Sequence, residues 1–511
     1  MAAMLLTQAT GLLLSVVINQ TFGIGAELDS FFAANRLTEV LFNLTAGGAL
    51  GSAFIPTFTG LLARENRAAA WKLASAVANL LLLILSLVSI LAIVFAPQIV
   101  QHGLYLLSPG EPLGQIELTT RMLRIMLPTV VIFGLSGLVM GVLNAHQRFW
   151  LPAIAPGMYS VGEILGVWLL PREWGILRLG YGALFGSLLH LLIQLPDLLR
   201  LNGRYVPTLG LRLGEVREVM RLMGPRILGV AVVQVNFIVN TMIALSLPAG
   251  SVAAIALAFT WMLMPQAAVA QAVAIAAMPT FSAQAALNQI DDLRSTLAGA
   301  LRGVLLLAVP AAVGLILVRT ALFTWIYQHG SFTAGMTELA AFALFWYALG
   351  LVGHSLLEVI VRAFYALHDT RTPVSIGVAA MGLNVLFSFA FSSLFSRLGW
   401  MPHGGLALAN SLATTLEMGV LVGLLSRRLG GLHGGKVLAA GGRALLGALG
   451  MGAAVAGWLA LTAGQAAGLQ VLGSAVLGGL VYAGLLVAMR VPETKMILNA
   501  AGKLLGRFIH S

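Results

Sequence analysis

The sequence contains no cysteine, and only 9% of its 511 residues are charged. The lack of cysteine excludes a disulfide, a thiolate metal site and a cysteine nucleophile. Soluble globular proteins carry about 25% charged residues, whereas 59% of this chain is hydrophobic. The shortage of charge therefore excludes a soluble globular protein and indicates a membrane protein.

Catalytic signatures are missing as well. The sequence has no HExxH, no GxSxG and no phosphate-binding GxxxxGK[ST], and its nine histidines are dispersed. We therefore expect no enzyme, no cofactor and no metal site. No basic segment precedes the first apolar stretch and no processing site follows it, so this stretch should remain in the mature chain as a membrane span.

Long apolar runs dominate what is present, and a span needs about 20 apolar residues. Their continuity favours helices over the short alternating strands of a β-barrel. The sequence predicts an all-α polytopic protein with about 14 transmembrane helices, two of them kinked at Pro56 and Pro265. The runs lie near residues 5–22, 33–61, 75–97, 124–145, 151–170, 178–199, 222–247, 252–283, 299–318, 336–366, 373–396, 404–425, 440–462 and 468–489.

The loop charges predict the orientation. Of the 29 Lys and Arg residues, 21 fall in or next to the loops after even-numbered spans and in the C-terminal tail, and six fall in or next to the opposite loops. Basic loops stay on the cytoplasmic side, so both termini are expected there, in a bacterial inner membrane. The net charge of +11 then reflects topology and attraction to anionic membrane lipids. No nucleic acid is expected as a partner, because the basic residues are spread over seven short segments.

Two short patterns recur at nearly the same distance. Pro56-Thr57-Phe58 returns 223 residues later as Pro279-Thr280-Phe281, and Leu143–Pro152 is echoed 221 residues later by Phe364–Pro373. Each copy holds six spans, and an even number gives both copies the same orientation. The repeat predicts two six-helix lobes, residues 1–215 and 216–430, with a terminal helix pair in 431–511. Such paired lobes are typical of alternating-access transporters.

Polar residues inside the spans mark a candidate cavity, because ionisable groups in lipid cost several kcal/mol (on the order of 3) and usually face a bundle interior. Arg36 and Glu39 are three residues apart and can neutralise one another. His354, Glu358 and Arg362 form one helical stripe. The alternative to a cavity role is that these residues pair with one another or extend their charged ends to the membrane surface, particularly Arg362 and Arg226. The amides among these residues could instead bond to a neighbouring helix: Asn19, Gln20, Gln234, Asn236 and Asn240.

Several motifs carry a resemblance to a family. They are Leu28–Ala34 (LDSFFAA), Met223–Gly229 (MGPRILG), Gly330–Thr333 (GSFT), Arg362–Ala366 (RAFYA) and Asp369–Pro373 (DTRTP). Together they resemble the MurJ (MviN) lipid II flippases of the multidrug/oligosaccharidyl-lipid/polysaccharide exporter superfamily, over essentially the whole chain. The resemblance implies fourteen spans and transport of the lipid-linked peptidoglycan precursor from the inner to the outer leaflet. It adds Asp29 to the candidate cavity and supports Arg36.

The chain departs from this family at its cavity arginines. The usual charged pair of the first span falls on Leu14 and Ser15, and the usual Arg of the second span falls on Phe42 or Asn43. The usual pair of the eighth span falls on Phe259 and Thr260. Arg36 and Arg226 would then meet the diphosphate, with Asn43 and Thr260 beside them. The chain also begins about ten residues later than such relatives, so a preceding segment is expected.

Two other functions remain open. An H⁺- or Na⁺-coupled exporter of amphipathic small molecules, or of another polyprenyl-linked glycan, would suit the loss of cavity charge and would couple through Glu39 or Glu358. A non-transporting scaffold for cell-wall synthesis would also explain the missing arginines, and it predicts no polar cavity.

Overall fold

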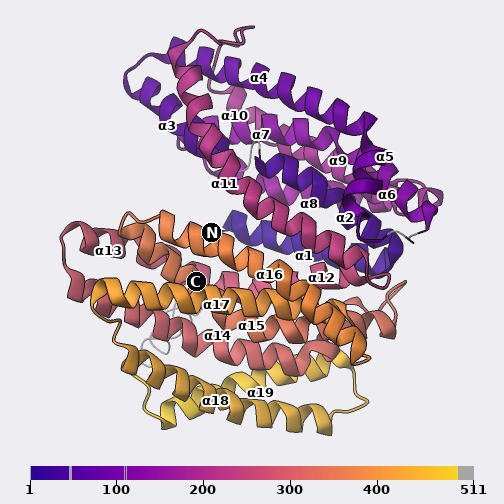
Figure 1. Ribbon diagram of the computed structural model, residues 1–511, viewed down its shortest axis with the longest axis vertical. Coiled ribbons are helices and arrows are strands. Elements are labelled where there is room, and N and C mark those ends of the chain that lie inside the picture. Colours follow the sequence, from indigo (N-terminus) through magenta and orange to yellow (C-terminus); the bar gives the residue numbers. More distant parts are fainter. Residues whose placement is uncertain (1, 45–48, 109, 111, 493–511) are drawn as a thin grey trace, which may run out of the picture. The chain divides into compact units, whose positions relative to one another are not determined.

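The computed structural model describes residues 2–44, 49–108, 110 and 112–492, and every regular element within these ranges is a helix (Figure 1). The chain forms two compact units. Unit 1 contains Met1–Ala253 and His329–Thr333, and unit 2 contains Ala254–Gln328 and Ala334–Ser511. The predicted all-helical class is confirmed for the described residues, whereas the division into two six-helix lobes and a terminal pair stays a prediction.

Unit 1 is built from eleven described α-helices and two short helical turns, π at Val100–Leu104 and 3-10 at Arg172–Trp174. The α-helices are α1 (Ala2–Phe22), α2 (Ala26–Phe42), α3 (Ala49–Ala63), α4 (Arg67–Val94), α5 (Ala96–Ile99), α6 (Leu113–Met126), α7 (Pro128–Ala145), α8 (Trp150–Leu169), α9 (Leu177–Leu192), α10 (Leu195–Leu199) and α11 (Gly214–Leu245). Its apolar core is formed by α3, α4 and α7 and includes Phe54, Phe58, Leu73, Leu85 and Leu143.

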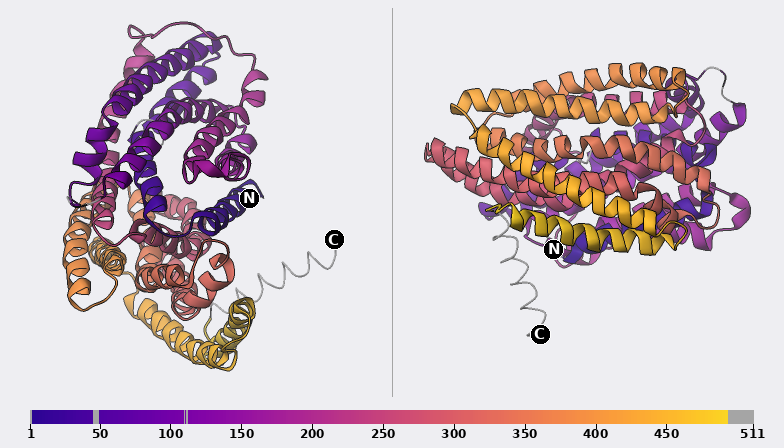
Figure 2. Two further views of the ribbon diagram at one scale, coloured as in Figure 1. Left: turned by 90° about the vertical axis from the view of Figure 1, so that its right-hand side faces the viewer. Right: turned by 90° about the horizontal axis from the view of Figure 1, so that it is seen from below.

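The remaining helices belong to unit 2, except that the first turn of α12 lies in unit 1. They are α12 (Ser251–Pro265), α13 (Ala272–Ala286), α14 (Ile290–Tyr327), α15 (Ala334–Ala366), α16 (Arg371–Arg397), α17 (His403–Leu429), α18 (Gly434–Leu461) and α19 (Ala467–Ala488). The long α14 and α15 carry the main core of this unit, and α18 and α19 lie side by side against α14 (Figure 2).

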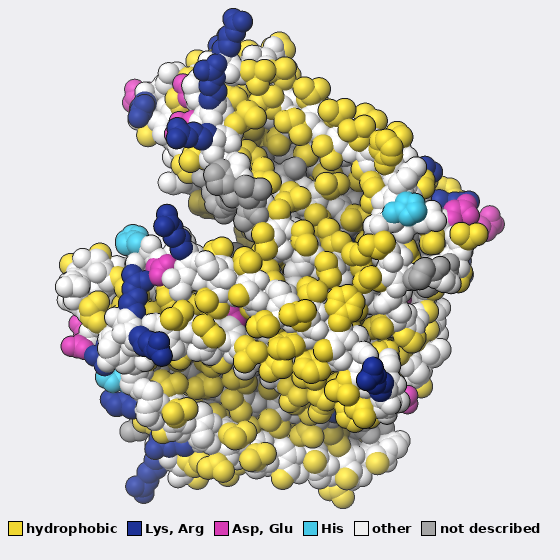
Figure 3. Space-filling model, viewed as in Figure 1, with side chains coloured by type: hydrophobic (Ala, Val, Ile, Leu, Met, Phe, Trp, Pro, Cys, Tyr) yellow, Lys and Arg dark blue, Asp and Glu magenta, His cyan; other side chains and the backbone are white. Residues whose placement is uncertain are grey.

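Ten segments of the described chain are long and apolar enough to cross a membrane. Hydrophobic side chains cover the lengths of the helices, while Lys and Arg gather at helix ends (Figure 3). This distribution agrees with the hydrocarbon solvating the helix faces and water solvating the loops. The chain is a polytopic membrane protein.

The helix expected to bend at Pro265 changes its winding there. Proline has no N–H and clashes with the preceding turn, and π-helical turns are a common cause of helix kinks. The helix α12 ends at Pro265, a π-helical turn follows over Gln266–Gln271, and α13 continues from Ala272. Pro56 instead lies inside α3.

Close helix packing is strongest between α8 and α9. A side chain on Gly162 would approach the Cα atom of Gly186 to 2.1 Å, and one on Gly166 would approach that of Gly182 to 2.4 Å. Only glycine fits such a contact, as in the small-residue interfaces of membrane helices. The glycines of both helices thus set the spacing at which their polar neighbours lie.

The sequence repeat reappears as two pairs of matching turns. Gln147 and His368 have φ of 59° and 58°, and each is followed by a backbone bond that closes the helix end, from Arg148 N to Leu143 O (2.9 Å) and from Asp369 N to Phe364 O (3.0 Å). Glu65 and Asn288 form a second matched pair, with φ of 57° and 56°. Each turn is a helix C-terminus in which a left-handed residue satisfies the last carbonyls.

The repeated prolines also occupy matching helix positions. Pro152 and Pro373 are each the third residue of their helices, α8 and α16. Pro56 and Pro279 each lie seven residues before the end of theirs, α3 and α13. The two copies of the sequence repeat therefore share local backbone structure at these positions, while the duplication of whole lobes stays a prediction.

Candidate functional site

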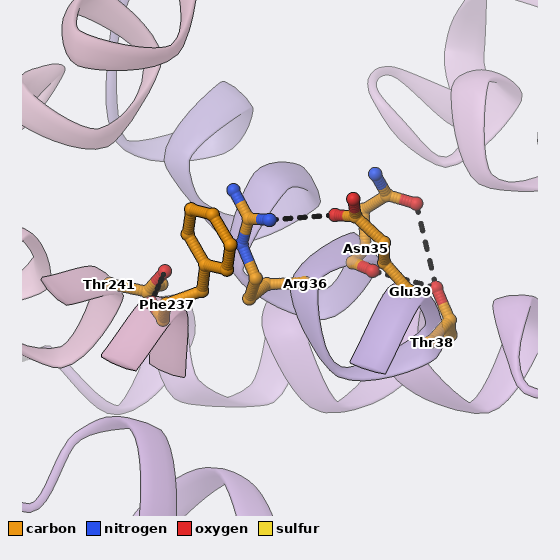
Figure 4. A network of polar contacts seen from close by, with 6 residues as sticks. All are labelled: Asn35, Arg36, Thr38, Glu39, Phe237 and Thr241. Carbon is orange, nitrogen blue, oxygen red and sulfur yellow. Dashed lines mark hydrogen bonds and ion pairs between the residues drawn. The ribbon is translucent and has the colours of Figure 1, made fainter. Parts of the chain in front are cut away.

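Arg36 and Glu39 form the ion pair that their spacing predicted. The Arg36 Nη1 atom lies 2.8 Å from Glu39 Oε2 on the next turn of α2, and its guanidinium carbon lies 4.9 Å from the ring centroid of Phe237 on α11 (Figure 4). The two side chains stay 29% and 45% exposed. An arginine has five N–H donors in a planar fork, and within the described residues one Nη1 bond serves Glu39, so the group retains donors for an anion.

Asp29 lies at the other end of α2 and has a structural role that the sequence did not predict. Its carboxylate is buried and accepts hydrogen bonds from the backbone N–H groups of Gly250 (2.6 Å) and Ala253 (2.7 Å) in the same unit. Free N–H groups at the start of a helix attract a carboxylate. Asp29 thus caps the first turn of α12.

Asn19 and Gln20, at the end of α1, have different hydrogen-bond partners. Asn19 is buried and donates to the Ser15 carbonyl (2.8 Å), while its Oδ1 atom is buried without a hydrogen-bond partner in the described part of the chain. The Gln20 carbonyl accepts from Ser331 N (2.8 Å), and Gly330 is required beside it, because a Cβ there would lie 2.4 Å from that oxygen. The GSFT motif therefore folds onto the end of α1.

Two amides of α11, Asn236 and Asn240, bond to each other within the helix. Asn240 donates to the carbonyl of Asn236 (2.9 Å) and to its side chain (3.3 Å). Gln234 is buried, and its Oε1 atom lacks a partner among the described residues. The backbone of α11 is described at Arg226, but the Arg226 side chain lies outside the described part of the structure. Asn43 caps the C-terminus of α2.

In unit 2 the candidate residues have polar partners on the same helix or on a neighbouring helix. The His354 Nε2 atom lies 3.0 Å from Asn410 Oδ1, and Glu358 pairs with Arg362 at 2.5 Å. Thr260 donates to the Ala256 carbonyl of its own helix (2.9 Å). Phe259, at a position where the resemblance implied a charged residue, packs against the rings of Tyr347 and His354. This cluster matches the alternative that Arg362 pairs with another candidate residue.

Both units also contain cavities. Unit 1 holds two, and the one with polar groups, called the cavity of unit 1 below, has a volume of about 360 Å³ and is lined by apolar side chains with three polar ones, Asn144, Tyr159 and His190. That of unit 2 has a volume of about 450 Å³, lies between α12, α14, α18 and α19, and is lined almost entirely by apolar groups. The first suits a ligand with both polar and apolar parts, and the second suits hydrocarbon.

Three polar groups that the sequence did not single out as sites belong beside these cavities. The Nδ1 atom of His190 lies 2.7 Å from Ser136 Oγ, and Gln194 donates to the same hydroxyl (2.7 Å). His190 and Gln194 are four residues apart in an apolar helix end, a spacing that could have revealed them. Tyr482 donates to the Leu306 carbonyl (2.7 Å) from a helix far along the chain, and no sequence pattern indicates that contact.

Outside the spans, the DTRTP motif forms a compact charged turn. Asp369 accepts from the backbone N–H of Thr372 (3.0 Å) and from its hydroxyl (2.8 Å), and Arg428 lies 2.7 Å away. These bonds, led by that from the Thr372 backbone, hold the pKa of Asp369 below its ordinary value. Arg148 of unit 1 occupies the position of the repeat that Asp369 occupies in unit 2, and it pairs with Asp197 (3.2 Å). The two equivalent loops thus carry opposite charges at this position.

Comparison of the fold gives the class of protein. A lipid II flippase MurJ in an inward closed conformation superposes with a TM-score of 0.80 at 24% identity, covering 96% of this chain and 98% of that structure. An inward-facing multidrug transporter of the MATE family and MOP superfamily follows with a TM-score of 0.70 at 13% identity, covering 83% and 94%. The chain therefore has the fold of MOP-superfamily transporters.

The sequence comparisons give the family. The pattern of the lipid II flippase MurJ family matches residues 18–475. The lipid II flippase MurJ of Burkholderia cenocepacia is 31% identical over 424 residues, 81% of this chain and 80% of that protein. The probable lipid II flippase MurJ of Vibrio cholerae is 28% identical over 427 residues, 82% and 80% of the two chains. The chain belongs to the lipid II flippase MurJ family.

Proposed function

We propose that the protein moves a lipid-linked peptidoglycan precursor, a polyprenyl-diphosphate glycan, from the inner to the outer leaflet of a bacterial inner membrane. Family membership is the observation that carries this proposal. The proposed topology is fourteen spans, two six-helix lobes (1–215 and 216–430), a helix pair in 431–511, and both termini in the cytoplasm. The matching turns and prolines support the duplicated lobes, and alternating access suits them.

The substrate sets three physical tasks: a cation for the diphosphate, a wet surface for the sugars and an apolar path for the tail. A diphosphate taken out of water needs a cationic partner, since burial of an ion carries a penalty of several kcal/mol (on the order of 5). Arg36 is the described cation that answers this need, because it is half-buried and its partner Glu39 is half-exposed. We assign the diphosphate to Arg36, aided by Arg226, while the polyprenyl tail stays in the lipid hydrocarbon.

We propose supporting roles in the same transport site for the other candidate residues. Asn19 and Gln234 have buried oxygens without partners in the described chain, as expected of groups that wait for a hydroxyl or amide donor. Glu39 and Glu358 are the groups that would bind a coupling ion, H⁺ or Na⁺. Glu358 is already paired with Arg362, so Glu39 is the stronger of the two.

A second candidate, export of an amphipathic small molecule, is favoured by one observation. Phe42 lines the cavity of unit 1, and Phe259 packs among aromatic rings. The family resemblance implied a charged residue at Phe259 and at either Phe42 or Asn43. Aromatic walls with a few polar groups are typical of sites for small amphipathic ligands. The MATE-like fold is compatible with such transport.

Native mass spectrometry of the purified protein separates the two candidates. After incubation with undecaprenyl-diphosphate-linked disaccharide pentapeptide, the flippase proposal expects a one-to-one adduct that survives competition by excess phosphatidylglycerol. Arg36→Ala should weaken binding at least tenfold, and Arg36→Lys, which keeps the charge but loses the fork, should retain part of it. Arg121→Ala, whose side chain is 61% exposed, is the matched control and should bind normally. An adduct that phosphatidylglycerol displaces equally well in all four proteins would overturn the assignment.

A further inference from the structure

Glu163 is a buried acid that the proposed transport site does not use. It lies in the middle of α8 with 4% of its surface exposed, at the glycine-lined interface with α9. A Cβ atom on Gly182 would lie 2.9 Å from the Glu163 Cα atom, so the helices leave no room for water between them there. An ionisable group at such a place in a span is a functional-site candidate.

No cation in the described residues pairs with this carboxyl. The helices packed against α8 are α1, α7 and α9, and neither α1 nor α7 contains an ionisable residue. On α9, Arg178 donates to the carbonyl of Val167 (2.8 Å), Tyr181 packs on Trp174, and His190 is held by Ser136. An isolated buried charge is costly, so a carboxyl here exchanges a proton rather than keeping a fixed charge.

Tyr159 connects Glu163 to the transport site. It lies one turn earlier on α8, and its hydroxyl is hydrogen-bonded to the Glu163 carboxyl. The same side chain lines the cavity of unit 1 together with Phe42, which lies one turn after Glu39 on α2. Glu39 in turn pairs with Arg36. Tyr159 thus places the buried acid beside a cavity whose wall also includes the turn of α2 that follows the Arg36–Glu39 pair.

We propose that Glu163 is an internal proton-binding site that couples proton uptake to the Arg36–Glu39 pair through Tyr159. The proposal rests on the proposed function for its coupling, but not for the proton site itself. Uptake adds one proton from water to a carboxylate oxygen of Glu163, and release returns it to water, with no redox partner. The change of one charge beside Tyr159 alters the field at Glu39 and hence how firmly Glu39 holds Arg36.

Infrared spectroscopy of the protein in lipid bilayers tests the proton site without any substrate. A protonated carboxyl gives a carbonyl band that disappears on ionisation, and the structure predicts such a band titrating in wild type and lost in Glu163→Gln. Glu173→Gln, an exposed acid in the turn that follows α8, is the control and should keep the band. Tyr159→Phe should keep the band and move its midpoint by about one pH unit, since it removes one hydrogen bond to the carboxyl. Identical titrations in wild type and Glu163→Gln, with both proteins folded by circular dichroism, would overturn the proton site.

The coupling is tested by repeating the titration with undecaprenyl-diphosphate-linked disaccharide pentapeptide bound. The lipid should shift the Glu163 midpoint in wild type and shift it by less than half as much in Tyr159→Phe. Because linkage is reciprocal, the affinity for the lipid should change with pH over the same range. A Glu163 band that titrates but ignores a bound lipid would refute the coupling alone. If the lipid does not bind at all, the transport proposal fails while the proton site stands.

Discussion

Tyr482 stabilises the terminal helix pair by bonding to a carbonyl that a proline leaves unpaired. Within α14, the Leu306 carbonyl would normally accept from the N–H of residue 310, but that residue is proline and has none. The hydroxyl of Tyr482 on α19 donates to this carbonyl at 2.7 Å, and the pair is buried. Replacing Tyr482 by Phe keeps the ring and removes the hydroxyl, so the carbonyl loses this hydrogen bond.

The expected cost is about 1–2 kcal/mol, since a hydrogen bond between membrane helices is worth about 0.6 and up to about 1.7 kcal/mol and a buried unpaired carbonyl adds to the loss. The free energy of unfolding in a detergent titration measures it. The control is Tyr181→Phe, whose side chain is exposed and should change stability little.

A double-mutant cycle makes the reason testable. In Pro310→Ala, the new N–H of residue 310 can bond to the Leu306 carbonyl, so adding Tyr482→Phe should cost less than half of what it costs in wild type. An equal cost in both backgrounds would refute the explanation and leave only a packing role for Tyr482.

Three further results follow from the described contacts. Asp29→Ala removes the cap of α12 and should cost about 1–2 kcal/mol of unfolding free energy, whereas Asp291→Ala, at a 92% exposed side chain, should cost less than about 0.5 kcal/mol; equal costs would contradict the capping role. Gly330→Ala should destabilise far more than Gly399→Ala in thermal unfolding, because both have positive φ but only Gly330 faces a backbone carbonyl within contact distance. The folded-state pKa of Asp369 is lowered, so its contribution to stability is present above its unfolded pKa and is lost as pH falls through the folded value. Asp369→Asn should therefore reduce the loss of unfolding free energy at acid pH. An unchanged pH dependence of the unfolding free energy would contradict this.

The fold could be predicted from the sequence as far as composition and local patterns determine it. Apolar runs are necessary for spans, so the helices were predicted, and the echo of Leu143–Pro152 in Phe364–Pro373 led to two turns with nearly the same φ. The pair Arg36–Glu39 was also predicted, because residues three apart share a helix face. These features depend on neighbours within a few residues.

Contacts between distant helices could not be predicted in the same way. Phe237 beneath Arg36, the Asp29 cap on α12 and the bond from Tyr482 to Leu306 each join residues far apart in the chain. Nothing in a local sequence pattern indicates which helices pack together. Among the amides of α11, Asn240 bonds to the backbone carbonyl one turn back, since a short side chain in a helix readily finds its own backbone, and the sequence alone did not predict this bond.

The central claim is that Arg36 carries the diphosphate of a lipid-linked glycan across the membrane. The direct measurement uses a fluorescent undecaprenyl-diphosphate-linked disaccharide pentapeptide in proteoliposomes. The rate at which it crosses the bilayer is read from the fraction of fluorescence that an impermeant quencher can reach. Wild type should exceed protein-free vesicles by at least tenfold, Arg36→Lys should be intermediate, and the double variant Arg36→Ala with Arg226→Ala should match the protein-free rate. Undiminished flipping in the double variant would contradict the account and point to export of small amphipathic molecules.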